Sequence, residues 1–160
     1  RDWPTIREAM LKTLALPKTG MGVNIDIGEE KNIHPADKQE VGRRLSLWAL
    51  GTVYGRKVES TTGPLPSGHQ VRGGEVAVTF SHADGGLVAK GGPLKGFALA
   101  GDDRLWKPAQ ARIEGDTVIV SCPEVKTPVS VRYAWENLPV CNLYNGAGLP
   151  ASPFRTDDWK

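Results

Sequence analysis

The sequence has few cysteines, no long hydrophobic run and no concentration of charge of one sign. Its two cysteines, Cys122 and Cys141, lack CxxC spacing and nearby histidines, so they predict no zinc site and leave either one disulfide or two free thiols. No apolar run approaches the roughly 20 residues that cross a bilayer. The 20 basic and 18 acidic residues leave a net charge of +2 without a basic block, so we expect neither a nucleic acid nor a membrane as partner.

The composition is that of a globular protein. Hydrophobic residues make up 39% of the 160 residues and charged residues 24%, which suits one domain of ordinary size or two small ones. The 19 glycines and 12 prolines indicate many turns and short strands. Two patterns meet near residue 56, with helical spacing before it and short β-rich runs after it.

The first third of the chain predicts a helix, a strand and a second helix. Pro4 suits the first turn of a helix, and apolar residues follow it at helical spacing: Ile6, Met10, Leu11 and Leu14. Residues 22–28 alternate apolar and polar side chains, which predicts a short strand. Pro35 opens the second helix, which runs to residue 54, and the apolar face of that helix comprises Val41, Leu45, Trp48, Ala49 and Val53.

Short β-rich runs between turn residues make up the remainder. Six of them cover residues 75–80, 87–90, 97–100, 109–113, 117–122 and 129–135. Strands of this length and spacing predict an antiparallel β-sandwich. Residues 113–117, IEGDT, predict a hairpin turn between two of the strands. We interpret the Gly- and Pro-rich residues 61–74 as a linker or an irregular crossing.

His34 is the most informative candidate for chemistry. If Pro35 is the first helical residue, His34 is the N-cap, and its imidazole projects from the loop between a strand and a helix. Asp26, Glu29 and Glu30 lie a few residues upstream, and a histidine oriented by a carboxylate is two thirds of a hydrolytic triad. The alternative is structural, because a histidine before a helix often only hydrogen-bonds the first turn.

A nucleophile is missing from this pattern. No Gly-x-Ser-x-Gly occurs, and no serine follows a strand and opens a helix. Ser67 and Ser81 lie close to His69 and His82 in the sequence. Adjacent side chains on a strand point to opposite faces, so we do not interpret either pair as a nucleophile and its base. We interpret both segments as turns between strands.

The aromatic residues of the β-rich part suggest a different function. Sugar-binding modules stack pyranose rings on exposed aromatic side chains, and Tyr133 and Trp135 share strand parity. Five residues of this kind are Trp106, Tyr133, Trp135, Tyr144 and Trp159. The competing interpretation is that these rings fill the core or its edge.

Several separate motifs carry a resemblance to a known family. Residues 26–45, DIGEEKNIHPADKQEVGRRL, closely resemble the last catalytic block of the sialate O-acetylesterase family, carbohydrate esterases with an SGNH-hydrolase core. The rest of the chain is similar to the carboxy-terminal region of that family. The motifs there are FALAG at 97–101, VRYAW at 131–135, NLYN at 142–145 and PFRTD at 153–157.

The resemblance implies an α/β plus all-β architecture. Residues 1–58 would hold the last strand (23–27) and the last helix (35–54) of a flavodoxin-like α/β/α esterase core, and residues 59–160 a β-sandwich lobe. It also implies that His34 is the triad histidine. Many SGNH enzymes have an aspartate three residues before the histidine, where this sequence has Lys31. The acid is therefore expected at Asp26 first and at Glu29 second.

The serine and oxyanion blocks of that family have no match here, so the resemblance places them on an upstream segment. The expected partners are that segment and an acetylated carbohydrate, either sialic acid or a plant polysaccharide such as acetylxylan. Neither a metal nor another cofactor is implied, and the family's habit predicts a periplasmic or secreted protein. The chain alone is expected to be inactive. The alternative is a non-catalytic β-sandwich module that binds carbohydrate or docks on a catalytic core.

Overall fold

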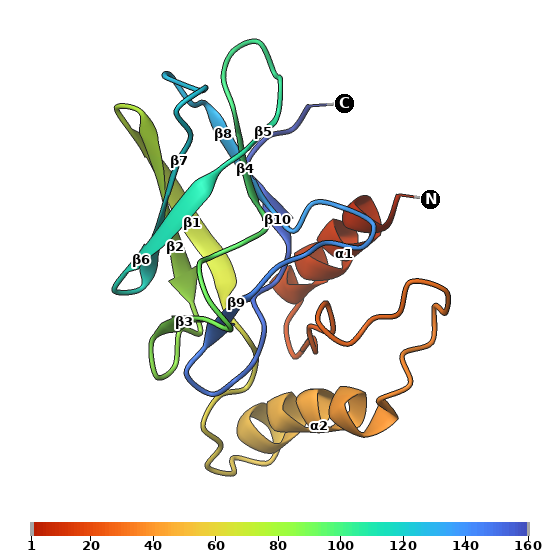
Figure 1. Ribbon diagram of the computed structural model, residues 1–160. Helices are drawn as coiled ribbons and strands as arrows, with labels where there is room; N and C mark the ends of the chain where they lie inside the picture. Colours follow the sequence, from red (N-terminus) through yellow and green to blue (C-terminus); the bar gives the residue numbers. More distant parts are fainter. Residues whose placement is uncertain (1, 160) are drawn as a thin grey trace.

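Two four-stranded antiparallel sheets dominate the computed structural model, which describes residues 2–159 (Figure 1). The first sheet has the order β1-β2-β7-β6 and the second β10-β8-β4-β5, while β3 and β9 pair as a two-stranded ribbon. The strands are β1 (Leu65–Arg72), β2 (Glu75–Ser81), β3 (Leu87–Ala89), β4 (Phe97–Ala100), β5 (Lys107–Pro108), β6 (Gln110–Glu114), β7 (Thr117–Ser121), β8 (Ser130–Tyr133), β9 (Leu143–Asn145) and β10 (Phe154–Arg155). We call residues 65–155 the β region.

One hydrophobic core lies inside the β region. The inward side chains of β2 and β7 are valines and a phenylalanine, as period-2 alternation demands of a strand with one buried face. They join side chains of β4, β8 and β10 in the same buried cluster, whose aromatic members are Phe80, Phe97, Tyr133 and Phe154. The rings of Phe97 and Tyr133 lie 4.7 Å apart, centroid to centroid. The two sheets therefore share their apolar side chains, and burial of that surface stabilises the fold.

All six predicted strands and the predicted hairpin are present. Glu114 pairs with Thr117 across a two-residue turn that joins β6 to β7. Gly115, the first turn residue, has a φ of +61°, which glycine adopts without the steric cost of a Cβ. Both cysteines are free thiols in the structure, Cys122 buried and Cys141 partly buried.

The interpretation of residues 61–74 as a linker was wrong, because most of that segment is β1. The strand pairs with β2 along its length, with an irregularity between Pro66 and Gly68. Six of its eight residues are exposed. An edge strand is held by backbone hydrogen bonds to one neighbour, so it needs no apolar alternation that a sequence pattern could reveal.

The N-terminal part holds two helices, α1 (Trp3–Lys12) and α2 (Lys38–Trp48). α1 continues into a 3₁₀ turn, η1 (Thr13–Ala15), and α2 into a π-helical segment, η2 (Ala49–Val53). Figure 1 shows α1 beside β10 and α2 at the far end of the molecule, away from the two large sheets. Among residues 2–159, no helix combines the length and the apolar character that crossing a membrane requires.

The predicted strand at residues 22–28 does not form, which corrects the expectation for 23–27. No segment of the described chain pairs with it, and a strand exists only where a neighbour takes up its backbone hydrogen bonds. The predicted second helix also begins later than expected. Its N-cap is Asp37, whose carboxylate accepts a hydrogen bond from the Glu40 N–H at 2.9 Å, so neither Pro35 nor His34 starts the helix.

Candidate active site

His34 lies at the exposed tip of the loop that precedes α2. Its backbone N–H donates to the Asn32 side-chain oxygen at 3.0 Å, and Glu29 forms an isolated β-bridge with Asn32. The Glu29 carboxylate accepts a hydrogen bond from the Ala36 N–H at 2.8 Å, which closes residues 29–36 into a compact turn. We call residues 27–36 the histidine loop. His34 is exposed to solvent on this loop.

Asp26 lies at the start of this loop, and its carboxylate is bound by two other side chains. Arg44 of α2 donates to both Asp26 oxygens, at 2.6 and 2.9 Å, in a bidentate pair. The hydroxyl of Tyr144 in β9 donates to Asp26 Oδ2 at 3.1 Å. Burial raises the pKa of Asp26, but the hydrogen bonds and charge of Arg44 outweigh it and hold the pKa below its usual value.

The structure does not bring either predicted acid into a hydrogen bond with the imidazole. Within residues 2–159, Asp26 is engaged by Arg44 and Tyr144, and one oxygen of Glu29 by the Ala36 N–H. The partner of Asp26 was missed because Arg44 is 18 residues away in sequence and looks like a solvated helix position. The spacing of Glu40 and Arg44 was a sequence signal that Arg44 is engaged rather than solvated, because residues four apart share a helix face and can form an ion pair.

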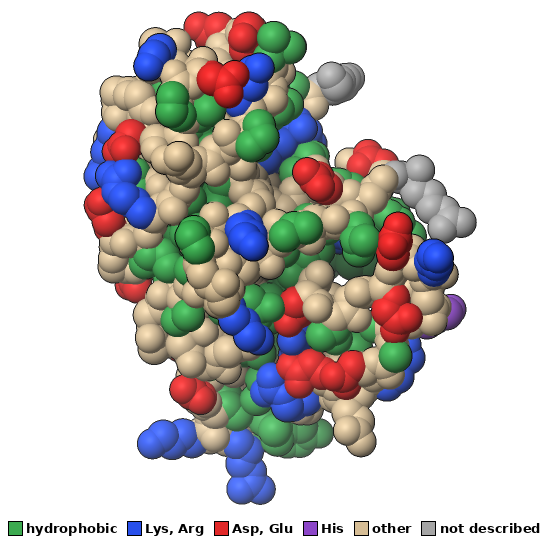
Figure 2. Space-filling model, viewed as in Figure 1, with side chains coloured by type: hydrophobic (Ala, Val, Ile, Leu, Met, Phe, Trp, Pro, Cys, Tyr) green, Lys and Arg blue, Asp and Glu red, His purple; other side chains and the backbone are tan. Residues whose placement is uncertain are grey.

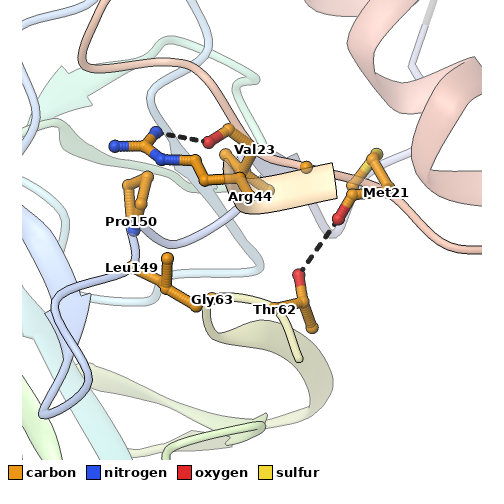
Figure 3. A pocket seen from close by; sticks show the side chains of 8 residues that line it. Met21, Val23, Arg44, Thr62, Gly63, Leu149 and Pro150 are labelled. Carbon is orange, nitrogen blue, oxygen red and sulfur yellow. Dashed lines mark hydrogen bonds between the residues drawn. The ribbon is translucent and has the colours of Figure 1, made fainter. Parts of the chain in front are cut away.

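Figure 3 shows how the segment before the histidine loop meets the β region. The Arg44 guanidinium also donates to the Val23 carbonyl oxygen at 2.6 Å, and the Thr62 hydroxyl donates to the Met21 carbonyl at 3.3 Å (Figure 3). The space that remains between Arg44, Thr62 and Leu149 measures about 10 Å³, enough for about one water molecule. Residues 21–26 are thus held by polar contacts with Arg44 of α2, with Thr62 and, through Asp26, with Tyr144 of the β region.

A larger groove of about 450 Å³ lies on the other side of the same segment. Its walls come from α1, from residues 21–33 and from the loops around residues 137–139 and 152–153, with Trp3, Ile6 and Met10 among the apolar side chains. Figure 2 shows the hollow between the β region and the N-terminal segment, with hydrophobic side chains at its wall. Ile6 and Met10 are exposed, so α1 presents part of its apolar face to this groove.

Ser67 and Ser81 are not paired with their neighbouring histidines. The Ser67 hydroxyl donates to Thr79 Oγ1 at 3.3 Å, and the Ser81 hydroxyl donates to the Leu65 carbonyl at 3.4 Å. Ser67 and His69 lie in β1 rather than in a turn, whereas His82 follows β2 with a φ of +57°. Neither serine lines the groove beside α1.

The aromatic residues proposed as a sugar platform are engaged with one another and with arginines. Tyr133 is 1% exposed and belongs to the core. The Arg132 guanidinium lies over the Trp106 ring, 4.1 Å from its centroid, and the Trp106 and Trp159 rings are 5.4 Å apart. Ala134, with a φ of +51°, breaks the strand between Tyr133 and Trp135, so the expected common direction of their side chains is lost. This arrangement favours the interpretation that the rings are internal packing.

Comparisons with known proteins identify the class of the chain. No family model matches it. A solved structure titled as a carbohydrate acetylesterase from Xanthomonas citri superposes on 98% of this chain with a TM-score of 0.94 at 43% sequence identity. The match covers 37% of that structure's chain. The described fold is therefore one that occurs inside a carbohydrate acetylesterase.

Curated relatives narrow the class to one family. The human and mouse sialate O-acetylesterases are each 31% identical to the chain, over 154 and 155 residues. Both alignments cover 87% of the chain, but only 29% and 28% of the relatives' own length. The chain is a homologue of the sialate O-acetylesterases, which confirms the resemblance in its sequence, and it spans less than a third of the curated relatives that it matches.

Proposed function

We propose that this chain is the carboxy-terminal portion of a serine-dependent carbohydrate O-acetylesterase, in which His34 acts as the general base. The observation that carries the proposal is the block around His34, which resembles the family's last catalytic block and lies on an exposed loop held at both ends. Residues 1–58 would complete an SGNH esterase core, and the two sheets of residues 59–160 would form a β-sandwich lobe beside it. The family's habit further suggests a periplasmic or secreted enzyme.

In the proposed reaction, a serine on an upstream segment attacks the acetyl carbonyl carbon. His34 takes the serine proton as the bond between the serine oxygen and the acetyl carbon forms. It returns the proton to the sugar oxygen as the C–O bond of the ester breaks. Water then attacks the acetyl-serine, with His34 as base again, and acetate leaves while the serine regains its proton. The substrate would be an O-acetylated sugar, sialic acid or acetylated plant polysaccharide.

Glu29 suits the role of the orienting acid better than Asp26. Both oxygens of the Asp26 carboxylate already accept hydrogen bonds from Arg44 or Tyr144. Glu29 lies on the histidine loop itself, and its Oε2 has no hydrogen-bond or ion-pair partner among residues 2–159. A carboxylate that orients the imidazole and stabilises the imidazolium needs such an unengaged oxygen. We therefore assign the acid to Glu29 and a different role to Asp26.

The upstream segment that carries the serine is also the proposed occupant of the exposed apolar surface. The groove beside α1 and the faces of α2 and η2 leave apolar side chains in water, among them Leu45 of α2 and Val53 of η2 at 51% and 61% exposure. An apolar face of this kind normally packs against other protein. More than half of the carbohydrate acetylesterase structure lies outside its match with this chain, which is enough chain to cover both surfaces.

The test is hydrolysis of an acetylated chromogenic ester by the full-length protein and by this chain alone. We expect activity only from the full-length protein, and a loss of at least thousandfold on His34→Ala, because triad members act as a unit. His69→Ala, on the exposed edge strand β1, is the matched control and should leave the rate unchanged. Activity in this chain alone, or in full-length His34→Ala, would contradict the proposal.

A further inference from the structure

Arg44 is the most fully engaged side chain of the N-terminal part. It is 5% exposed, and its guanidinium donates to Asp26, to Glu40 Oε1 at 2.7 Å and to the Val23 carbonyl. A buried guanidinium is stable only when it is paired and hydrogen-bonded. Hydrogen bonds from Arg43 and then from Arg44 lower the pKa of Glu40 to about 2, against its desolvation. Both carboxylates are therefore ionised, and Arg44 ties the start of the histidine loop to α2.

Tyr144 adds a contact from the β region to the same carboxylate. It lies in β9, 118 residues from Asp26 in the sequence, and its side chain is largely buried. Burial, and next the charge of Asp26, raise the pKa of Tyr144 to about 12. The hydroxyl thus remains a donor at every pH at which an esterase works. The Lys90 ammonium lies 4.8 Å from the ring centroid and does not take part in this hydrogen bond.

The histidine loop is consequently held at both of its ends by the same helix. Directly before the loop, Asp26 is bound by Arg44 on the second turn of α2. The last end of the loop runs into the N-cap Asp37 of α2, and Glu29 closes the loop between them. A shift of Asp26 would move the loop that carries His34, because the loop has only ten residues between these anchors. A displacement of about 1 Å at a reacting group can cost a hundredfold in rate.

We infer that Arg44 and Tyr144 are positioning residues for His34, acting through Asp26, and that Tyr144 makes the β region part of the active-site framework. The inference rests on the proposed role of His34 as general base. On this inference, the β region contributes to catalysis without contacting the sugar. The inference also gives Asp26 a role as an anchor of the loop rather than as the acid of the triad.

The experiment is a double-mutant cycle in the full-length protein. Tyr144→Phe removes one hydroxyl and keeps the ring, and Asp26→Asn keeps the shape and removes the charge. We expect Tyr144→Phe to lower kcat about tenfold with KM unchanged, the effect of one hydrogen bond to a charged group. Asp26→Asn also weakens the pair with Arg44, so it should lower kcat by at least about tenfold but by less than about a thousandfold, again with KM unchanged. In the Asp26→Asn background, Tyr144→Phe should add less than a further twofold change. Lys90→Met, beside the same ring, is the control and should leave kcat unchanged.

Four results would overturn the inference. They are an unchanged kcat in Tyr144→Phe, additive effects in the double variant, a fall in kcat that only follows a fall in the amount of folded protein, and a thousandfold or greater loss in Asp26→Asn. The last would restore Asp26 as the triad acid. Failure of the proposed function is separate, because it is detected as activity that survives His34→Ala.

Discussion

Asp157, just beyond β10, forms a buried ion pair with Arg132 of β8. Arg132 donates to both oxygens of Asp157, at 2.8 and 2.7 Å, and the Asp157 side chain is 0% exposed. The Arg132 guanidinium at the same time stacks on Trp106, so its planar face and its edge are both used. Removing the carboxylate would leave a largely buried cation without a full partner, which costs more than the pair contributes.

At the residue scale, we expect Asp157→Ala to lower the free energy of unfolding by roughly 3 kcal/mol. Glu75→Ala is the matched control, because Glu75 pairs with Arg112 in the same bidentate way, but at the surface, with side chains 38% and 51% exposed. Water screens that exposed pair, so Glu75→Ala should lower the free energy of unfolding far less than Asp157→Ala does. Urea unfolding followed by tryptophan fluorescence measures both. Equal losses in the two variants would contradict this account.

The β1–β2 hairpin places residues 65–72, which show no apolar alternation in the sequence, at the edge of the first sheet. Arg72 pairs with Glu75 across the two-residue turn Gly73–Gly74. Gly73 has a φ of +60°, whereas Gly74 lies outside the left-handed region. A turn with a positive φ at its first position matches the twist of paired strands. The tight turn of this hairpin therefore needs a glycine at position 73.

At the scale of this element, we expect Gly73→Ala to lower the free energy of unfolding by about 1–2 kcal/mol, because an L side chain is strained at that φ. Gly74→Ala, one residue later, is the control. Its Cβ would meet nothing closer than the Lys126 carbonyl oxygen at 3.5 Å, an ordinary contact, so its effect should stay within about 0.5 kcal/mol. Thermal unfolding compares the two, and a larger loss in Gly74→Ala would refute the assignment.

The whole molecule is stabilised unevenly along the chain. Every member of the buried core cluster lies between Val76 and Phe154. Residues 2–58 contribute three buried side chains, those of Pro4, Val23 and Arg44. The N-terminal part is joined to the β region mainly by polar contacts, such as Arg155 with Glu8 and Arg7 with the Glu136 carbonyl. The sheets have a core of their own, and the helices do not.

At this scale, we predict that residues 59–160 fold when expressed by themselves and that residues 1–58 do not. The first polypeptide should unfold cooperatively in urea, because it retains the complete core cluster. The second should show little stable structure, since short helices without a packed face are marginal in water. Circular dichroism measures both. A cooperative transition in residues 1–58, or its absence in residues 59–160, would refute the predicted boundary near residue 58.

The sequence predicted the parts of this molecule whose signal is local. The strand β2 has apolar side chains at every second position, and β7 is a short β-branched apolar run next to a turn. The β6–β7 turn contains a glycine where its backbone needs one, so these elements could be predicted without knowledge of the fold. The resemblance around His34 is local too, because it lies in one continuous block. The start of α2 was misplaced because Pro35 and Asp37 are both ordinary helix-start residues, and the contact of Glu29 with Ala36 decides between them.

Alternation, turn chemistry and a continuous motif therefore determine, by themselves, the antiparallel β part, its hairpin and the candidate histidine. Tertiary structure alone decided the edge strand β1, the absence of a strand at residues 22–28 and the partners of Asp26. The physical reason is the same in each case: a backbone hydrogen bond or an ion pair is made with whichever group the fold brings near. Tyr144 is 118 residues from Asp26, and no pattern along the chain encodes that distance of 3.1 Å.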